Sequence, residues 1–502
     1  MSSIITRLRR AANSRRIGLA LYLTLIITTA VAVGAAAYFS VSPANLNAEL
    51  PPELSNTTQA ANNNSDIALS PSLSQTKLVQ NEDGTVYLNL AIKTPSLGTE
   101  CKRIDRATDM TIVLDRSGSM ADPRKLPYAK AALKELLNQL SENDRFALIS
   151  FDSSAVVHSG LQAVSASARE SLSNAIAQLQ PGNSTNLSDG LNAALGLIQD
   201  SPSDRTRKVI LLSDGEANEG ITSLPELNRL AGQFAGRSIV LSTIGMGLGF
   251  NETLMASMAD YGMGSYSYLE HLDLLGEILA KNLSDSRSLY AETSSIELTL
   301  KPGVHLVDAG SYPYSQDHGN ASTVRIQTGQ LLNGSNKNII FTFRAPTSEL
   351  GDFDLANISL NITTKGKSRN IGAPKNPLRY SVVAPARRDE AVASMDKDMY
   401  RKSWVENNYG KMKLTVSEAI SRGDKEKAVD AINSYRQGIA KAEKKSGAEL
   451  RTDRLEADLG AVQSHMESAF SGPLAEQPEK QNRLSKELQL KGRREQRLGS
   501  NN

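Results

Sequence analysis

Cysteine, histidine and aromatic residues are scarce in this sequence, and each scarcity excludes a class of protein. The single cysteine, Cys101, excludes an intrachain disulfide and any zinc cluster built from cysteines. The five histidines are scattered and none belongs to an HExxH motif, so a zinc protease of that type is not supported. Aromatic residues make up 5% of the chain, and no aromatic and basic array suited to single-stranded nucleic acid is present.

A large excess of either charge is also missing. The chain has 56 Lys and Arg against 54 Asp and Glu, which gives a formal net charge of +2. No overall electrostatic field favours nucleic acid, and we expect no nucleic acid partner. At 502 residues the chain is too long for one hydrophobic core, so two to four domains are expected.

One long run without charge stands near the N-terminus. Residues 1–16 contain five arginines and no acid, and residues 17–39 contain no charged residue. At ~1.5 Å per residue this run can cross ~30 Å of hydrocarbon. The positive-inside rule then predicts a cytoplasmic basic segment over residues 1–16, a single transmembrane helix over residues 17–39, and a remainder that is periplasmic or at the cell surface. A signal peptide cleaved near Ala37 is the alternative, but the apolar run exceeds the usual ~7–15 residues.

The next two stretches differ in composition. Residues 40–75 are rich in Asn, Ser, Pro and Ala with few large apolar side chains, which predicts a disordered linker. Residues 76–104 contain two strand-like runs around Glu82-Asp83-Gly84, which indicates a hairpin. These strands need a sheet to join.

Residues 105–285 alternate strand and helix signals, whereas the stretch after them does not. The alternation predicts a mostly parallel, doubly wound (Rossmann-like) α/β domain, whose ligand site lies beyond the carboxyl ends of the strands. Residues 286–386 contain short strands separated by Gly, Asn and Pro, which is typical of an antiparallel β-sandwich. The strands of residues 76–104 are expected to complete this sandwich, so that the α/β domain is inserted in it or flanked by it.

The C-terminal part of the chain is highly charged. Residues 387–479 show apolar residues at helical spacing, which predicts a charged helical region. Residues 480–502 are basic and are expected to form a solvated tail.

Short oxygen-bearing side chains follow three segments of the predicted α/β domain. The strand TIVLD ends in Asp115, and Ser117 and Ser119 follow on alternate residues. Thr185 precedes a helix, and Asp214 ends the strand KVILLSD. Because these segments meet at one end of the sheet, two carboxylates and three hydroxyls come together there. Oxygen donors suit a hard cation such as Mg²⁺ or Mn²⁺, and the sequence does not distinguish the two.

This pattern of Asp115, Ser117, Ser119, Thr185 and Asp214 resembles the von Willebrand factor type A (VWA) domain and its metal-ion-dependent adhesion site. The order of domains is also similar to that of bacterial membrane-anchored VWA proteins. The resemblance implies that the three hydroxyls coordinate Mg²⁺ directly, with the carboxylates acting directly or through water. It further implies an open coordination position, which an Asp or Glu of a protein partner fills.

Other polar residues near the pattern are assigned separately. Asp122 lies where some relatives place a ligand for an adjacent metal, which would be Ca²⁺, but Pro123 follows it instead of a second acid. Asp189 and Glu216 are expected to cap helices or to support the ligands. The run Gly245-Met246-Gly247-Leu248-Gly249 follows a strand, but Phe250 stands in place of a further glycine, so no nucleotide site is predicted.

These observations predict a non-catalytic, membrane-tethered, extracytoplasmic protein that binds a partner protein through Mg²⁺. One alternative is an accessory or scaffolding subunit of a transport or channel-like complex in the envelope. A weaker one is a metal-dependent hydrolase, because no Ser/His/Asp or Cys/His arrangement accompanies the predicted site.

Overall fold

The computed structural model describes residues 67–96, 106–122, 124–317, 322–372 and 378–497. The segment 1–16, the expected transmembrane helix over residues 17–39, most of the expected linker and Cys101 lie outside these residues. Among the helices that the structure describes, none combines the length and the apolar character needed to cross a membrane.

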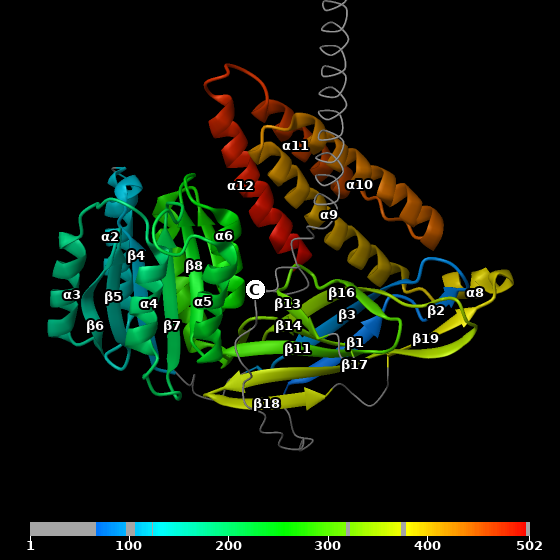
Figure 1. Cartoon of the computed structure of the whole chain (residues 1–502), viewed down its shortest axis with the longest axis horizontal. Coiled ribbons are helices and arrows are strands. Elements are labelled where there is room, and N and C mark those ends of the chain that lie inside the picture. Colours follow the sequence, from blue (N-terminus) through cyan, green and yellow to red (C-terminus); the bar gives the residue numbers. More distant parts are fainter. Residues whose placement is uncertain (1–66, 97–105, 123, 318–321, 373–377, 498–502) are drawn as a thin grey trace, which may run out of the picture. The chain divides into compact units, whose positions relative to one another are not determined.

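Residues 106–287 form an α/β domain around a six-stranded sheet (Figure 1). Its strand order is β6-β5-β4-β7-β8-β9, and β4 lies parallel to both β5 and β7. The strands are β4 (Thr108–Asp115), β5 (Arg145–Phe151), β6 (Ala155–Ala163), β7 (Thr206–Ser213), β8 (Val240–Met246) and β9 (Met263–Leu269). The predicted doubly wound sheet is therefore present, and the edge strand β6, antiparallel to β5, is an addition to the prediction.

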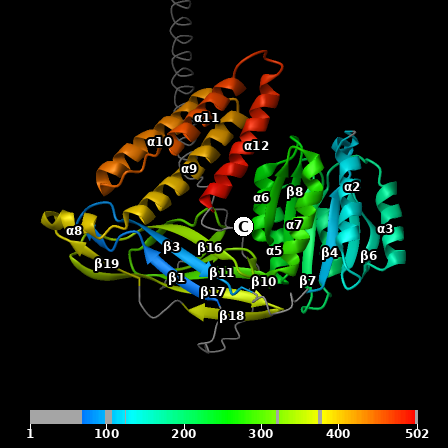
Figure 2. The same ribbon diagram turned by 180° about the vertical axis from the view of Figure 1, so that it is seen from behind.

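Helices cover both faces of this sheet, so its central strands β4 and β7 are buried on both sides. One face is covered by α4 (Leu187–Ile198), α5 (Leu224–Gly236) and α6 (Glu252–Tyr261). The opposite face, seen in Figure 2, is covered by α2 (Lys125–Gln139), α3 (Ala166–Gln178) and α7 (Leu275–Arg287). Each set of helices encloses its own apolar core against the sheet.

Strands that precede the α/β domain in the sequence and strands that follow it together form a second domain, the β domain. One sheet has the order β1-β3-β16-β12, and the other has the order β13-β14-β11-β17-β19-β2 with β18 beside β17. A single apolar core includes residues from both sheets. The strands are β1 (Ala68–Leu73), β2 (Lys77–Val79), β3 (Thr85–Lys93), β10 (Leu289–Ala291), β11 (Thr293–Leu300), β12 (His305–Asp308), β13 (Tyr314–Asp317), β14 (Thr323–Gln327), β15 (Leu331–Leu332), β16 (Asn336–Arg344), β17 (Gly351–Thr364), β18 (Lys367–Gly372) and β19 (Leu378–Val383).

The pairing of these strands shows that the α/β domain is inserted in the β domain. Strand β3 precedes the insertion and pairs along its length with β16, which follows it. Two expectations are corrected here. The runs around Glu82-Asp83-Gly84 do not form a hairpin, because β2 pairs in parallel with β19 and β3 lies in the other sheet. The C-terminal end of the expected linker is ordered, because β1 pairs antiparallel with β3.

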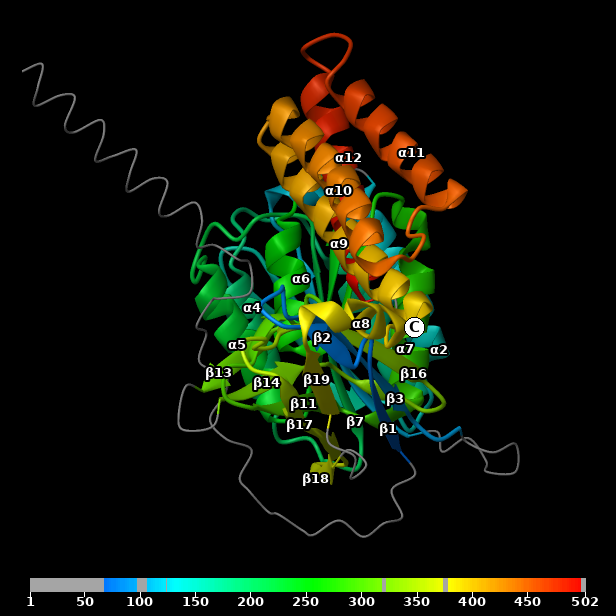
Figure 3. The same cartoon turned by 90° about the vertical axis from the view of Figure 1, so that its right-hand side faces the viewer.

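The C-terminal region is helical, as predicted, and it continues beyond the predicted limit. After α8 (Arg388–Ala393) come the long helices α9 (Lys397–Ser421), α10 (Lys425–Ser446), α11 (Asp453–Ala469) and α12 (Gln477–Gln496). Helix α9 packs against α10 and α12, and α11 packs against α10 and α12 (Figure 3). The expectation of a solvated tail from residue 480 is wrong, because α12 buries Leu484 and Leu488 in the core of this region.

A close glycine contact explains how a polar helix can pack so tightly. A Cβ atom on Gly410 of α9 would lie 2.6 Å from the carbonyl oxygen of Gly492 on α12. A Cβ atom on Gly492 would lie 2.8 Å from the carbonyl oxygen of Gly410. The two backbones therefore meet at a distance that side chains would prevent.

A buried ion pair joins the α/β domain to the β domain where the chain passes between them. Arg106 donates to the Glu292 carboxylate at 2.5 Å, and the side chains are 7% and 2% exposed. The same guanidinium donates to the backbone carbonyls of Ser203, Asp204 and Arg205. Its donors are thus shared between the two domains, which fixes the connection.

We expect the substitution Arg106→Ala to lower the free energy of unfolding by about 3–5 kcal/mol, because it leaves the buried Glu292 carboxylate without its ion-pair partner and with only the backbone N–H of Lys365 as a donor among the described residues. Urea denaturation followed by circular dichroism measures the change. Arg325→Ala is the matched control, since the Arg325–Glu297 pair is partly exposed and its loss should cost below about 1 kcal/mol. Equal losses in the two variants would contradict the importance assigned to the buried pair.

Candidate functional site

Asp115 ends β4 at the carboxyl edge of the sheet, and both of its carboxylate oxygens are held in place. Asp115 is fully buried. Its Oδ1 accepts a hydrogen bond from the backbone N–H of Ser117 at 2.8 Å. Its Oδ2 accepts one from the Ser213 hydroxyl, at the end of β7, at 2.6 Å. The neighbouring strands β4 and β7 are thus joined through this side chain.

The two serines after Asp115 turn toward Asp214. A short 3₁₀ helix begins at Gly118, and the hydroxyl oxygens of Ser117 and Ser119 lie 3.1 Å apart. Ser119 donates to Asp214 Oδ1 at 2.8 Å. Asp214 is fully buried, whereas Ser119 is exposed. The cluster therefore has a buried base and reaches the surface at Ser119.

Thr185 comes from a third loop, which is hydrogen-bonded to both of the others. The N–H of Gly118 donates to the carbonyl of Asn183 at 2.8 Å, and the N–H of Thr185 donates to the side-chain Oδ1 of Asn218, in the loop after β7, at 2.8 Å. Thr185 is 3% exposed. All the loops that carry the predicted residues are therefore fixed to one another.

Gly215 locates the space that these residues surround. A Cβ atom built on Gly215 would lie 3.2 Å from Thr185 Oγ1, 3.5 Å from Ser119 Oγ and 3.7 Å from Asp115 Oδ2. Oxygens from two loops thus converge on a position in a third loop, which is open because residue 215 has no side chain. An all-oxygen donor set around a small space fits a hard divalent cation. The structure brings together all five residues that the sequence indicated.

Lys125 is a member of the cluster that the sequence reasoning missed. Its ammonium group lies 2.5 Å from Asp214 Oδ2, and its side chain is 16% exposed. It is the first residue of α2, directly after the loop that carries the serines. Ser213 was also missed, although it precedes Asp214 in the sequence. A lysine at the start of a helix does not by itself indicate such a contact.

The three secondary candidates have separate roles. Asp122 is partly exposed and accepts from the backbone N–H of Arg124 at 3.0 Å. Asp189, in the first turn of α4, accepts from the backbone N–H of Ala155 at 2.6 Å. Glu216 is exposed. The Asp122 and Asp189 carboxylates thus accept hydrogen bonds from backbone N–H groups outside the oxygen cluster.

The glycine-rich run after β8 is a packing element. A Cβ atom on Gly245 would lie 2.3 Å from the ring of Phe250, so the ring covers this glycine. A Cβ atom on Gly249 would lie 3.0 Å from the backbone oxygen of Asp214. The absence of side chains at both positions lets this loop pack behind the cluster.

Burial dominates the electrostatics of Asp115. Removal from water raises the pKa of its carboxyl group from the ordinary 3.8 to about 6, the hydrogen bonds from Ser117 and Ser213 oppose that change, and the negative charge of Asp214 adds to it. The ionised form is therefore disfavoured unless positive charge is close. This is the electrostatic environment that a cation would relieve.

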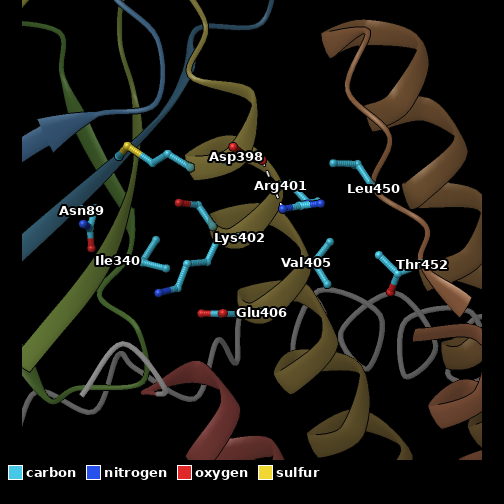
Figure 4. Close-up of a pocket in the computed structure, with 11 residues that line it drawn as sticks. Asn89, Ile340, Asp398, Arg401, Lys402, Val405, Glu406, Leu450 and Thr452 are labelled. Carbon is cyan, nitrogen blue, oxygen red and sulfur yellow. Dashed lines mark hydrogen bonds and ion pairs between the residues drawn. The ribbon is translucent and has the colours of Figure 1, made fainter. Parts of the chain in front are cut away.

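Two further facts about the described residues bear on where a ligand could bind. No group of three or more His, Cys, Asp and Glu side chains within them is arranged to hold a metal ion, so the oxygen cluster depends on its hydroxyls. A pocket of about 500 Å³ lies between α9, the sheet residues Asn89 and Ile340, and the loop that contains Leu450 and Thr452 (Figure 4). Its charged side chains, Asp398, Arg401, Lys402 and Glu406, carry both signs, and no residue of the oxygen cluster lines it.

Comparison with known proteins identifies the α/β domain. Residues 110–216 match the family model of the von Willebrand factor type A domain. The chain contains a VWA domain. The match includes Asp115, Ser117, Ser119, Thr185 and Asp214, and it confirms the predicted domain type.

Two curated relatives align with part of the chain. The uncharacterized protein YfbK of Escherichia coli is 27% identical over 202 residues, which are 39% of this chain and 34% of that protein. The human inter-alpha-trypsin inhibitor heavy chain H3 is 27% identical over 216 residues, which are 40% of this chain and 24% of that protein. The chain thus spans about a third or less of the length of these two relatives.

Two solved structures share the wider architecture. A von Willebrand factor type A structure from Catenulispora acidiphila has a TM-score of 0.62 at 16% identity and covers 86% of this chain and 98% of its own. The ArnB paralog VWA2 from Sulfolobus acidocaldarius has a TM-score of 0.51 at 14% identity and covers 87% and 99%. At these identities the likeness concerns the fold, and it extends well beyond the VWA domain.

We expect Asp115→Asn to stabilise the metal-free protein at pH 7.5, because it removes a buried negative charge beside Asp214 while keeping the side chain's shape. The rise of the pKa of Asp115 from 3.8 to about 6 corresponds to about 3 kcal/mol at this pH, so a gain of about 1–3 kcal/mol is expected in EDTA. The folded state binds this proton more tightly than the unfolded state, so the difference should fade as the pH falls from about 6 to about 4. Thermal unfolding at several pH values measures it, and a variant less stable than the wild type at pH 7.5 would contradict the assignment.

Proposed function

We propose that this protein is a membrane-tethered, extracytoplasmic binding protein whose VWA domain holds Mg²⁺ and takes an acidic side chain of a protein partner. The observation that carries the proposal is the convergence of Asp115, Ser119 and Thr185 oxygens on the space at Gly215. Ser117 and Asp214 complete the donor set. The tether is residues 17–39, with residues 1–16 in the cytoplasm, and this part of the proposal rests on the sequence alone.

The chemistry of the donor set supports a role in binding. Three neutral hydroxyls and two carboxylates would hold the ion, and Mn²⁺ suits the same donors. A bound divalent ion would supply positive charge and a coordination position open to a carboxylate from outside. The exposed Ser119 marks the side from which a partner reaches the cluster. The ammonium of Lys125 on Asp214 is consistent with a cluster that attracts positive charge.

The residues around the cluster support binding without catalysis. The polar side chains of Asp115, Ser117, Ser119 and Asp214 each engage another residue of the cluster or the backbone of their own loop. The described contacts of the cluster include no histidine, and they give its hydroxyls no neutral base that could take a proton. A metal ion held in this way presents charge and a fixed position, which suits recognition of a carboxylate.

We expect Gly215→Ala to weaken Mg²⁺ binding at least tenfold without removing any donor atom. The added methyl group would lie 3.2 Å from Thr185 Oγ1 and occupy the space between the oxygens. Isothermal titration with Mg²⁺, repeated with Mn²⁺, measures the affinity. Gly196→Ala on α4 is the matched control, because its Cβ atom would meet no atom within 4 Å. Unchanged Mg²⁺ affinity in Gly215→Ala would place the ion elsewhere.

We expect capture of the partner to need both the metal and Asp115. Cross-linking in membranes followed by affinity purification of the full-length chain should recover a protein that is lost in EDTA and lost with Asp115→Ala. Restoring Mg²⁺ should restore capture by the wild type alone. A partner retained in EDTA would show that binding does not pass through the metal.

A further inference from the structure

Helix α12 of the C-terminal region contacts the VWA domain at the edge of the sheet where the oxygen cluster lies. Asn482 donates to the backbone oxygen of Leu248, in the loop after β8, at 2.8 Å. Arg483 pairs with Glu270, in the loop after β9, at 2.7 Å. These loops neighbour the one that carries Asp214 after β7, because β7, β8 and β9 are adjacent in the sheet. Helix α12, which belongs to the helical region, therefore contacts two of the three loops that follow β7, β8 and β9.

Lys486 is the central contact of this interface. It is 3% exposed, and its ammonium lies 2.8 Å from the backbone oxygen of Phe250 and 2.9 Å from Glu252. The same ammonium lies 4.2 Å from the centre of the Phe250 ring, in a cation–π contact. Burial lowers the pKa of Lys486, and the negative charges of Glu252 and Glu216 oppose that shift. Glu216 follows Asp214 by two residues, so Lys486 of α12 also interacts electrostatically with the loop after β7.

The far end of α12 is fixed by a second ionic group. Arg493 and Arg497 both pair with Asp260 of α6, at 3.0 and 2.7 Å. Arg497 also donates to the backbone oxygen of Ser311 in the β domain at 2.6 Å. The C-terminal end of α12 is therefore held by two domains, whereas its N-terminal half touches the VWA loops.

The two sides of α12 differ in chemistry. Toward α9 it presents Leu484, Leu488 and the close contact of Gly492 with Gly410. The same side also carries buried polar contacts, namely hydrogen bonds between Ser485 and Ser417 and the pair of Glu495 with Lys413. Toward the VWA domain it makes ion pairs and hydrogen bonds, and the Phe250 ring lies under Lys486. Polar contacts between domains separate more readily than an apolar core. If the VWA domain moves, α12 remains with the helical region.

A continuous series of contacts leads from Lys486 to the oxygen cluster. The Phe250 ring under Lys486 covers Gly245, where a Cβ atom would lie 2.3 Å from the ring. Gly245 of β8 pairs with Ser213 of β7. The Ser213 hydroxyl donates to Asp115 Oδ2 at 2.6 Å. A shift of Phe250 would therefore act on the strand end that orients Asp115.

We propose that α12 is a clasp whose docking on the VWA domain sets the geometry of the oxygen cluster. In its metal-dependent part this inference rests on the proposed function. Docking of α12 and binding of a divalent ion to the cluster are then coupled. By thermodynamic linkage, each event changes the equilibrium constant of the other by the same factor.

Hydrogen exchange of the full-length chain, combined with Mn²⁺ titration, tests the coupling. Lys486→Met removes the ammonium and keeps the length of the side chain. Glu252→Gln weakens the same contact from the VWA side and leaves α12 unchanged. Lys491→Met is the matched control, because Lys491 pairs with Glu487 of its own helix and is 54% exposed. We expect both interface variants to exchange faster over residues 477–490, 247–252 and 213–216, and to bind Mn²⁺ at least fivefold more weakly or more tightly than the control.

The outcomes separate the two proposals. Faster exchange over 477–490 with unchanged exchange over 213–216 would overturn the coupling, as would a Mn²⁺ affinity within twofold of the control. Unchanged exchange everywhere in both variants would overturn the clasp. If the wild type binds no Mn²⁺, the proposed function fails, and the exchange of residues 213–216 alone decides whether α12 acts on the cluster. Should Lys486→Met fail to fold, Glu252→Gln provides the same readouts.

Discussion

The placement of two buried carboxylates at the ends of neighbouring strands is the constraint on which the rest of this structure depends. Asp115 ends β4 and Asp214 follows β7, and neither is accessible to solvent. Two like charges at such a position raise the energy of the folded state unless donors and positive charge surround them. The serine hydroxyls, the backbone N–H of Ser117 and the ammonium of Lys125 supply part of that compensation. A cation bound between the two buried carboxylates would therefore lower the free energy of the folded state.

The cluster could be predicted from the sequence because its residues stand next to recognisable strands. Asp115, Ser117 and Ser119 occupy alternate positions after an apolar strand, and Asp214 follows another strand of the same kind. Parallel strands bring such ends to one edge of a sheet, so the juxtaposition follows from the strand pattern. Lys125 and Ser213 could not be predicted in the same way. Their contacts depend on side-chain directions at the start of a helix and on the register between β4 and β7, which the sequence pattern leaves open.

Other elements were missed because they carry weak periodic signals. In β6 the valines at 156 and 157 are adjacent and both exposed, so the alternation typical of a half-buried strand is absent. Helix α12 has a strongly polar sequence, and its tight packing on α9 combines two buried leucines with a close approach of glycines on the two helices, which is a weak signal in the sequence. The insertion of the VWA domain could be predicted, since the strand-like runs before it required partners. The parallel pairing of β2 with β19 could not, because only the path of the chain between the sheets determines it.

The composition of the α12 interface bears on how the domains work together. At the junction, Arg106 is buried with Glu292 and uses its remaining donors on the backbone, an arrangement that is costly to break. Along α12 the contacts to the VWA domain are several and ionic, and they differ in exposure. Arg483 is half exposed, so salt and water compete for its pair with Glu270, whereas Lys486 and Asp260 are buried. The junction therefore acts as a fixed connection, and the exposed pair of Arg483 is the part of the α12 interface that opens at the lowest cost. Since Phe250 links that interface to Ser213 and Asp115, a ligand of the helical region and a ligand of the oxygen cluster would act on one equilibrium.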